Sequence, residues 1–123
     1  MHGPTLDVTR DINDKPIAIT EFGTSSEQPD GGHDPERKEN WLETAYEFVE
    51  EQEDVLMTLY FNFSKEMDWA VFNGEHGADT TEIGGNSYNV YPAYRDAITQ
   101  DGVLGPHPDH PRILTDDEFA GEF

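Results

Sequence analysis

One carboxylate follows an unusually apolar run, in a position where several enzyme folds place a catalytic side chain. Residues 15–23 read Lys-Pro-Ile-Ala-Ile-Thr-Glu-Phe-Gly, so Glu21 closes an isoleucine-rich segment. A short apolar run between proline and glycine predicts a strand that is buried on both faces, as in a parallel sheet. Carboxyl ends of such strands carry the catalytic residues of (β/α)8 barrels. Glu21 is therefore a candidate catalytic carboxylate, and an ordinary solvated glutamate at a strand end is the alternative.

Two short segments combine histidine with aspartate, which are common metal ligands. The first holds Asp30, His33 and Asp34, and the second holds His107, Asp109 and His110. Neither has the ligand spacing or the ordered surroundings of a closed metal site. We therefore expect solvated loop histidines, no metal and no cofactor. Ser25 and Ser26 lie near His33 in sequence, but no strand-turn-helix elbow surrounds them, so no activated serine is expected.

The elements that must position Glu21 form a strand-helix-strand pattern. Asp34 suits a helix N-cap and Pro35 suits the first helical position, so a helix is predicted over residues 34–52. Its apolar residues recur at helical spacing and form one broad stripe: Trp41, Leu42, Ala45, Tyr46, Phe48 and Val49. A second apolar run of strand length follows at residues 55–63. This order predicts one βαβ unit with parallel strands and a right-handed crossover.

The remaining segments are more polar. Residues 64–89 contain several glycine turn signals, and a second helix is predicted over residues 92–100. Residues 1–14 form a lead-in segment without a clear period. The stretch 103–123 is rich in proline, histidine and acids, which predicts a flexible tail. The structured domain is thus expected over residues 15–102, and two strands alone do not make an independently stable parallel sheet.

Charge restricts the possible partners of this chain. Its 123 residues include 27 acidic and 7 basic residues, which gives a formal net charge of −20. The chain contains no cysteine. Such a chain repels nucleic acids and anionic membranes, so neither is an expected partner. No run approaches the ~18 apolar residues of a membrane helix. An acid-rich, lysine-poor surface suits concentrated salt, which indicates a halophilic protein, with a merely acidic surface as the alternative.

The halophilic interpretation predicts that salt stabilises the fold. We expect the midpoint of thermal unfolding to be higher in molar KCl than in dilute buffer, because screening weakens the repulsion among the acids. Circular dichroism melts at the two salt concentrations check this. Equal unfolding midpoints at the two salt concentrations would contradict the halophilic interpretation and favour the alternative of a merely acidic surface.

Four segments in this order resemble the C-terminal end of a family 26 glycoside hydrolase. They are residues 15–23, the helix containing Trp41, Leu-Tyr-Phe-Asn-Phe-Ser-Lys-Glu-Met-Asp-Trp (59–69) and Pro-Ala-Tyr-Arg-Asp-Ala-Ile (92–98). This is the β-mannanase-like group of retaining enzymes built on (β/α)8 barrels. The resemblance implies an α/β fold: a partial (β/α)8 TIM barrel consisting of the last two β/α units. It also implies hydrolysis of a β-1,4-linked polysaccharide or oligosaccharide such as mannan, glucan or xylan.

The resemblance also implies roles for individual residues. Glu21 matches the nucleophile at the end of strand seven, where we expect hydrogen bonds to its charged form. Tyr60 stands where the family carries a tryptophan that stacks on the sugar, and a core aromatic is its alternative. Lys65, Asp68 and Trp69 match a motif after strand eight that is expected to brace the loop, with Trp69 near the substrate.

The region that resembles the family does not include the general acid. A retaining glycosidase needs a second carboxylic acid, which this superfamily carries on strand four, before the matched region. Glu66, Asp68 and Glu75 have no spacing that favours this role over solvated loop acids. The chain is therefore expected to be inactive alone and to require the missing N-terminal part of the barrel. For a full-length relative the resemblance implies an extracellular enzyme.

A second class of function stays open at this point. The chain could be a small acidic domain without enzymatic activity that binds carbohydrate or a protein partner. Its aromatic contact residues would then be Tyr60, Trp69, Tyr88 and Tyr91. Retardation by a soluble polysaccharide, without covalent labelling of Glu21, would distinguish this class from the glycosidase.

Overall fold

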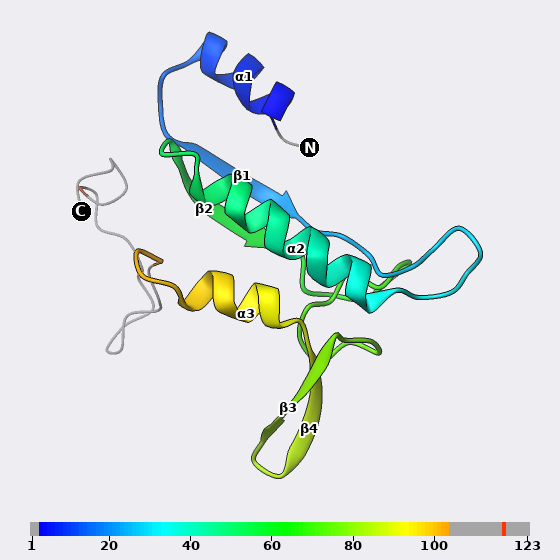
Figure 1. Cartoon of the computed structure of the whole chain (residues 1–123). Coiled ribbons are helices and arrows are strands. Elements are labelled where there is room, and N and C mark those ends of the chain that lie inside the picture. The colour runs from blue at the N-terminus through cyan, green and yellow to red at the C-terminus, as the bar shows by residue number, and fades with distance from the viewer. Residues whose placement is uncertain (1–2, 104–116, 118–123) are drawn as a thin grey trace.

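The chain folds as a small α/β protein. The computed structural model describes residues 3–103 and 117 (Figure 1). The elements follow in the order α1 (Gly3–Ile12), β1 (Ile17–Phe22), α2 (Pro35–Glu50), β2 (Val55–Tyr60), β3 (Asp79–Ile83), β4 (Asn86–Val90) and α3 (Pro92–Thr99). Strands β1 and β2 form a parallel two-stranded sheet, and β3 and β4 form an antiparallel one. The described residues thus contain no closed barrel. Apart from Val103 and Asp117, the predicted tail lies outside them.

The predicted strand-helix-strand order with parallel strands is confirmed. The β1–β2 register pairs Ile17 with Val55 and Phe22 with Tyr60, and it shifts twice in between. Helix α2 begins as its sequence predicts, because the Asp34 side chain accepts a hydrogen bond from the Arg37 amide at 2.9 Å. Figure 1 shows α2 lying along the two strands and α3 beside it.

Apolar packing holds α2 on one face of the parallel sheet. Ile19 and Phe22 of β1 are buried against Ala45 of α2. The Phe22 ring lies 5.4 Å from the Trp41 ring and 5.3 Å from the Tyr46 ring, between ring centroids. These distances are typical of favourable tilted and edge-to-face pairs. Phe22 is therefore the centre of the contact between the strand and the helix.

The opposite face of the parallel sheet is not covered by the described residues. Ala18, Thr20, Met57 and Leu59 are exposed, although we expected both strands to be buried on both faces. That expectation is wrong for this chain, because α2 covers one face and no other described element packs on the second. Parallel sheets normally have both faces covered, so a parallel sheet with one exposed face is unusual.

Polar contacts attach the flanking helices to this unit. Arg10 of α1 donates to both carboxylate oxygens of Asp54, at 2.7 and 2.6 Å. This hydrogen bonding lowers the pKa of the Asp54 carboxyl. At the other end, Glu39 of α2 accepts a 2.6 Å hydrogen bond from the Ala93 amide in the first turn of α3. The lead-in segment therefore includes an anchored helix, and α2 caps α3.

Buried tyrosines predict a loss of stability at high pH. Burial raises the pKa of Tyr60 to about 12, and it also raises those of Tyr46 and Tyr91. The stabilisation from these neutral phenols is complete below the unfolded-state pKa of 10.0 and is lost as the pH rises toward 12. We expect the urea midpoint to fall between pH 10 and 12, measured by circular dichroism with tyrosinate absorbance. A midpoint that stays constant over this range would contradict the prediction.

Candidate functional site

Glu21 lies where the sequence predicts, next to the carboxyl end of β1. It is exposed, and its neighbour Phe22 accepts a 2.9 Å hydrogen bond from the Phe61 amide just beyond β2. The carboxyl ends of both strands therefore meet beside Glu21. The hydrogen bonds that we expected for its carboxylate are not supplied by the described residues, which is a correction to the sequence-based prediction. The physical reason is its position on the uncovered side of the sheet.

Trp69 is brought to the same end of the sheet. A Cβ atom placed on Gly23 would lie 3.7 Å from Trp69 Cε3 and 3.8 Å from Phe61 Cβ. The indole is only partly buried, and Gly23 follows Glu21 by two residues. The structure thus places Trp69 and Phe61 against Gly23, two residues beyond Glu21, at the carboxyl ends of the two parallel strands.

Tyr60 occupies a different environment from Glu21. Its ring packs among aromatic residues on the helical side of the sheet, 5.4 Å from the Tyr94 ring and 6.2 Å from the Phe22 ring. Its hydroxyl donates to the Trp69 carbonyl at 2.9 Å and lies 3.3 Å from the Thr24 amide nitrogen. This geometry agrees with the core aromatic that we kept as the alternative. Stacking on a sugar stays a prediction for Tyr60.

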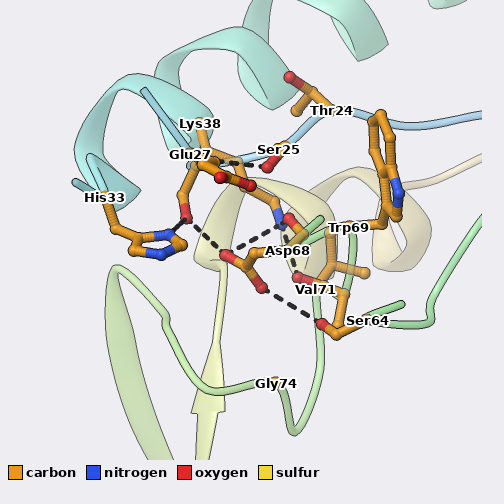
Figure 2. Close-up of polar contacts among 12 residues, drawn as sticks. Thr24, Ser25, Glu27, His33, Lys38, Ser64, Asp68, Trp69, Val71 and Gly74 are labelled. Atoms are coloured by element: carbon orange, nitrogen blue, oxygen red, sulfur yellow. Dashed lines mark hydrogen bonds and ion pairs between the residues drawn. The ribbon is translucent and has the colours of Figure 1, made fainter. Parts of the chain in front are cut away.

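A buried lysine braces the loop that carries Trp69 (Figure 2). Lys38 Nζ donates to the carbonyl oxygens of Asp68 and Ala70, at 2.8 and 2.7 Å, and these two residues flank Trp69. The lysine side chain is 0% exposed and lies 3.9 Å from the Asp68 carboxylate. Its ammonium also lies 4.6 Å from the centre of the Tyr91 ring, a cation–π contact. Lys38 therefore fixes the backbone on both sides of Trp69.

Sequence reasoning assigned part of this bracing role to the wrong lysine. Lys65 is exposed and pairs only with the adjacent Glu66, at 3.3 Å. Lys38 was missed because a lone lysine in a charged helix normally points into solvent. Its environment is unusual: burial lowers its pKa to about 8, and the charge of Asp68 opposes that shift. Asp68 does brace the loop, as predicted.

Asp68 is held by two serines. Ser26 Oγ donates to Asp68 Oδ2 at 2.5 Å, and Ser64 Oγ lies 3.4 Å from Asp68 Oδ1. Ser26 is fully buried, and its oxygen also lies 2.9 Å from His33 Nδ1. Since the single hydroxyl proton points to the carboxylate, His33 must be the donor to Ser26. The serine thus stands between the histidine and the acid, an order that does not activate it as a nucleophile.

His33 is exposed, as expected for a loop histidine, but its ring also makes two specific contacts. Besides its contact with Ser26, the His33 ring stacks on the His76 ring, with 3.8 Å between centroids and 22° between planes. Within residues 3–103 and 117, no group of three histidine, aspartate or glutamate side chains could hold a metal ion. The second histidine segment, with His107, Asp109 and His110, lies outside the described residues.

Tyr91 offers a test of this buried network. Its hydroxyl is buried near Ser26 without a hydrogen bond of normal geometry, while its ring contacts the Lys38 ammonium. We expect Tyr91→Phe to leave the free energy of unfolding unchanged or to raise it by about 1 kcal/mol, because it removes an unsatisfied buried polar group. Urea titration checks this, and a loss above about 1 kcal/mol would show that the hydroxyl is hydrogen-bonded.

Comparison of the chain with protein-family models, curated proteins and solved structures found no match. No helix in the described part of the chain is long and apolar enough to cross a membrane.

Proposed function

We propose that this chain is the last two β/α units of a retaining glycoside hydrolase barrel that cleaves β-1,4-linked polysaccharide. The observation that carries the proposal is the exposed Glu21 at the carboxyl end of a parallel strand, with Trp69 beside Gly23. In barrels of this kind the catalytic residues lie at that end of the strands. The resemblance of residues 15–23 and 59–69 to the family 26 enzymes supports the same assignment.

Glu21 has the role of nucleophile in this proposal. Its ionised carboxylate attacks the anomeric carbon, the glycosidic C–O bond breaks, and a glycosyl ester forms on Glu21. The leaving oxygen takes a proton from a carboxylic acid about 5–5.5 Å from the nucleophile. The same acid, then ionised, removes a proton from water, which hydrolyses the ester and restores Glu21. A partly exposed indole such as Trp69 offers an apolar face for a sugar ring.

The proton donor must come from a partner in this proposal. Asp68 is engaged by Ser26 and Ser64, and Glu66 forms an exposed pair with Lys65. The two-stranded β1–β2 sheet supports this proposal, because further parallel strands at its free edges would have to come from outside the described elements. The missing N-terminal part of the barrel would supply both the remaining strands and the acid.

Covalent labelling tests the role of Glu21. Fluoride leaves without a proton donor, so we expect a 2-deoxy-2-fluoro-β-glycosyl fluoride of mannobiose, cellobiose or xylobiose to add one glycosyl group per chain although the general acid is absent. Peptide mass spectrometry should locate the label at Glu21. Glu21→Gln should abolish the label, and the control Glu66→Gln should retain it. Labelling spread over several surface acids at similar rates would contradict the proposal.

A non-enzymatic binding domain is the second candidate. One observation favours it: the partly buried Tyr88 stacks on the exposed Phe72, with 5.4 Å between ring centroids, on the β3–β4 hairpin side of the molecule. Tyr91 is only 1% exposed and cannot offer its ring to a ligand. Retardation in gels that contain soluble mannan or xylan, lost in Tyr88→Ala and unaccompanied by labelling of Glu21, would support this candidate.

A further inference from the structure

We propose that the groove along the open edge of β2 binds a β-strand of a partner polypeptide, parallel to β2 and basic at its N-terminal end. The inference concerns the docking of that partner. It takes from the proposed function only the idea that further strands complete the sheet, and it does not require Glu21 to be a nucleophile.

The groove is formed by three elements that lie around an unoccupied strand position. Its volume is about 580 Å³. It runs along β2 and is bordered by the C-terminal ends of α2 and α3. Its apolar lining includes Val49, Val55, Met57, Leu59 and Val103. Within the described residues β2 pairs only with β1, so its second edge has unpaired backbone groups. An open edge next to an apolar groove is the arrangement that accepts an added strand.

Exposed apolar side chains continue from this groove over the uncovered face of the sheet. Met57 is 38% exposed and Leu59 is 51% exposed, and Phe61 and Phe63 follow them along the chain. Burial of such side chains gains about 25 cal/mol for each Å² removed from water. A partner strand beside β2, with apolar side chains at alternate positions, would cover part of this surface and extend the parallel pairing already present between β1 and β2.

The charges of the groove decide the direction of the strand. Glu50, Glu53 and Asp101 line it, and no lysine or arginine does. Glu53 lies just before Val55, the first residue of β2, and Glu50 ends the preceding helix. The acids therefore gather at the N-terminal end of β2. A strand with lysine or arginine at its own N-terminal end matches them only when it runs parallel to β2.

The net charge of the whole chain disfavours a second copy of this chain as the occupant. Each copy has a formal net charge of −20, so two copies repel one another. A partner with basic residues gains attraction where a second copy meets repulsion. A second copy of residues 1–123 is therefore not the occupant that the charges favour.

A designed peptide tests the proposal with the full chain. The probe is acetyl-Lys-Lys-Val-Ala-Val-Thr-Val-Tyr-amide, added to isotope-labelled protein at pH 7 in about 0.15 M KCl, where the screening length is about 8 Å. We expect saturable amide shifts in NMR spectra that concentrate on residues 55–60. A second version of the peptide, with a nitroxide group in place of the acetyl group, should broaden the Val55 signal more strongly than the Tyr60 signal.

Matched variants and a charge-reversed peptide complete the test. Leu59→Glu should weaken binding at least about tenfold, since it places a charge in the apolar groove. Ile83→Glu, at a 56% exposed site on the hairpin, should leave binding within about twofold. A peptide that begins with Glu-Glu should bind more weakly than the lysine peptide.

Several outcomes would overturn the proposal. They are unchanged β2 signals at 5 mM peptide, stronger broadening at Tyr60, equal binding by the acidic peptide, and dimers of the chain itself. None of these bears on covalent labelling of Glu21, which the glycosyl fluoride measures separately. Failure of the docking inference and failure of the glycosidase proposal can therefore be told apart.

Discussion

Replacement of Lys38 by methionine is expected to lower the free energy of unfolding by about 3–5 kcal/mol. Methionine keeps much of the volume of lysine, but it leaves the carbonyl oxygens of Asp68 and Ala70 without their donor. It also leaves the buried Asp68 carboxylate without the ammonium at 3.9 Å. Breaking a buried charged pair is more damaging than never having formed it, because the remaining charge stays desolvated. Urea unfolding in molar KCl, followed by circular dichroism, measures the loss.

The matched control for this prediction is Lys65→Met. Lys65 lies in the motif that the sequence suggested as the loop brace, but its side chain is 64% exposed and pairs only with Glu66. Exposed pairs contribute about 0–1 kcal/mol, so this variant should keep nearly the full free energy of unfolding. If the two variants lost similar amounts, or if Lys65→Met lost more, Lys38 would not be the lysine that fixes the loop around Trp69.

Truncation of Phe22 to alanine is the second prediction with a large effect. The side chain is 2% exposed and packs against the rings of Trp41, Tyr46 and Tyr60. Its removal should lower the free energy of unfolding by about 3–5 kcal/mol, through lost burial and the cavity that remains between β1 and α2. Near-ultraviolet circular dichroism should weaken as well, because the three remaining rings of Trp41, Tyr46 and Tyr60 lose the phenyl ring that they pack against.

Phe63→Ala is the control for this second prediction. Phe63 is 59% exposed and contacts Phe61 in an edge-to-face pair with centroids 6.4 Å apart. Its truncation should change the free energy of unfolding by less than about 1 kcal/mol. A larger effect at Phe63 than at Phe22 would mean that the main core lies on the other face of the sheet.

The elements around the parallel sheet could be predicted from local sequence patterns. Helix α2 follows from the Asp34 N-cap, Pro35 and an apolar stripe, and each of these signals acts within a few residues. The hairpin of β3 and β4 was missed because its strands are mostly polar. The Gly84-Gly85 pair was nevertheless a signal in the sequence, because a two-residue hairpin turn requires residues that adopt positive φ. In the structure their φ angles are 59° and 83°.

The candidate site could be predicted from the sequence only in part. Glu21 belongs to a short motif, so its position at a strand end could be predicted. The partners that hold the Trp69 loop come from distant parts of the chain: Ser26 lies 42 residues before Asp68, and Lys38 lies 30 residues before it. No local pattern reports such a pairing, because the burial that makes it favourable exists only after α2 has packed on the sheet.

Two levels of information are therefore distinct in this protein. Composition and local patterns determined its acidic character, its βαβ unit and the place of Glu21 at a strand end, since side-chain periodicity and capping act over one or two turns. The tertiary structure decided which lysine is buried, where Tyr60 points and which sheet face stays uncovered. Those properties depend on which surfaces meet in space, and free energies of burial and desolvation arise only from that meeting.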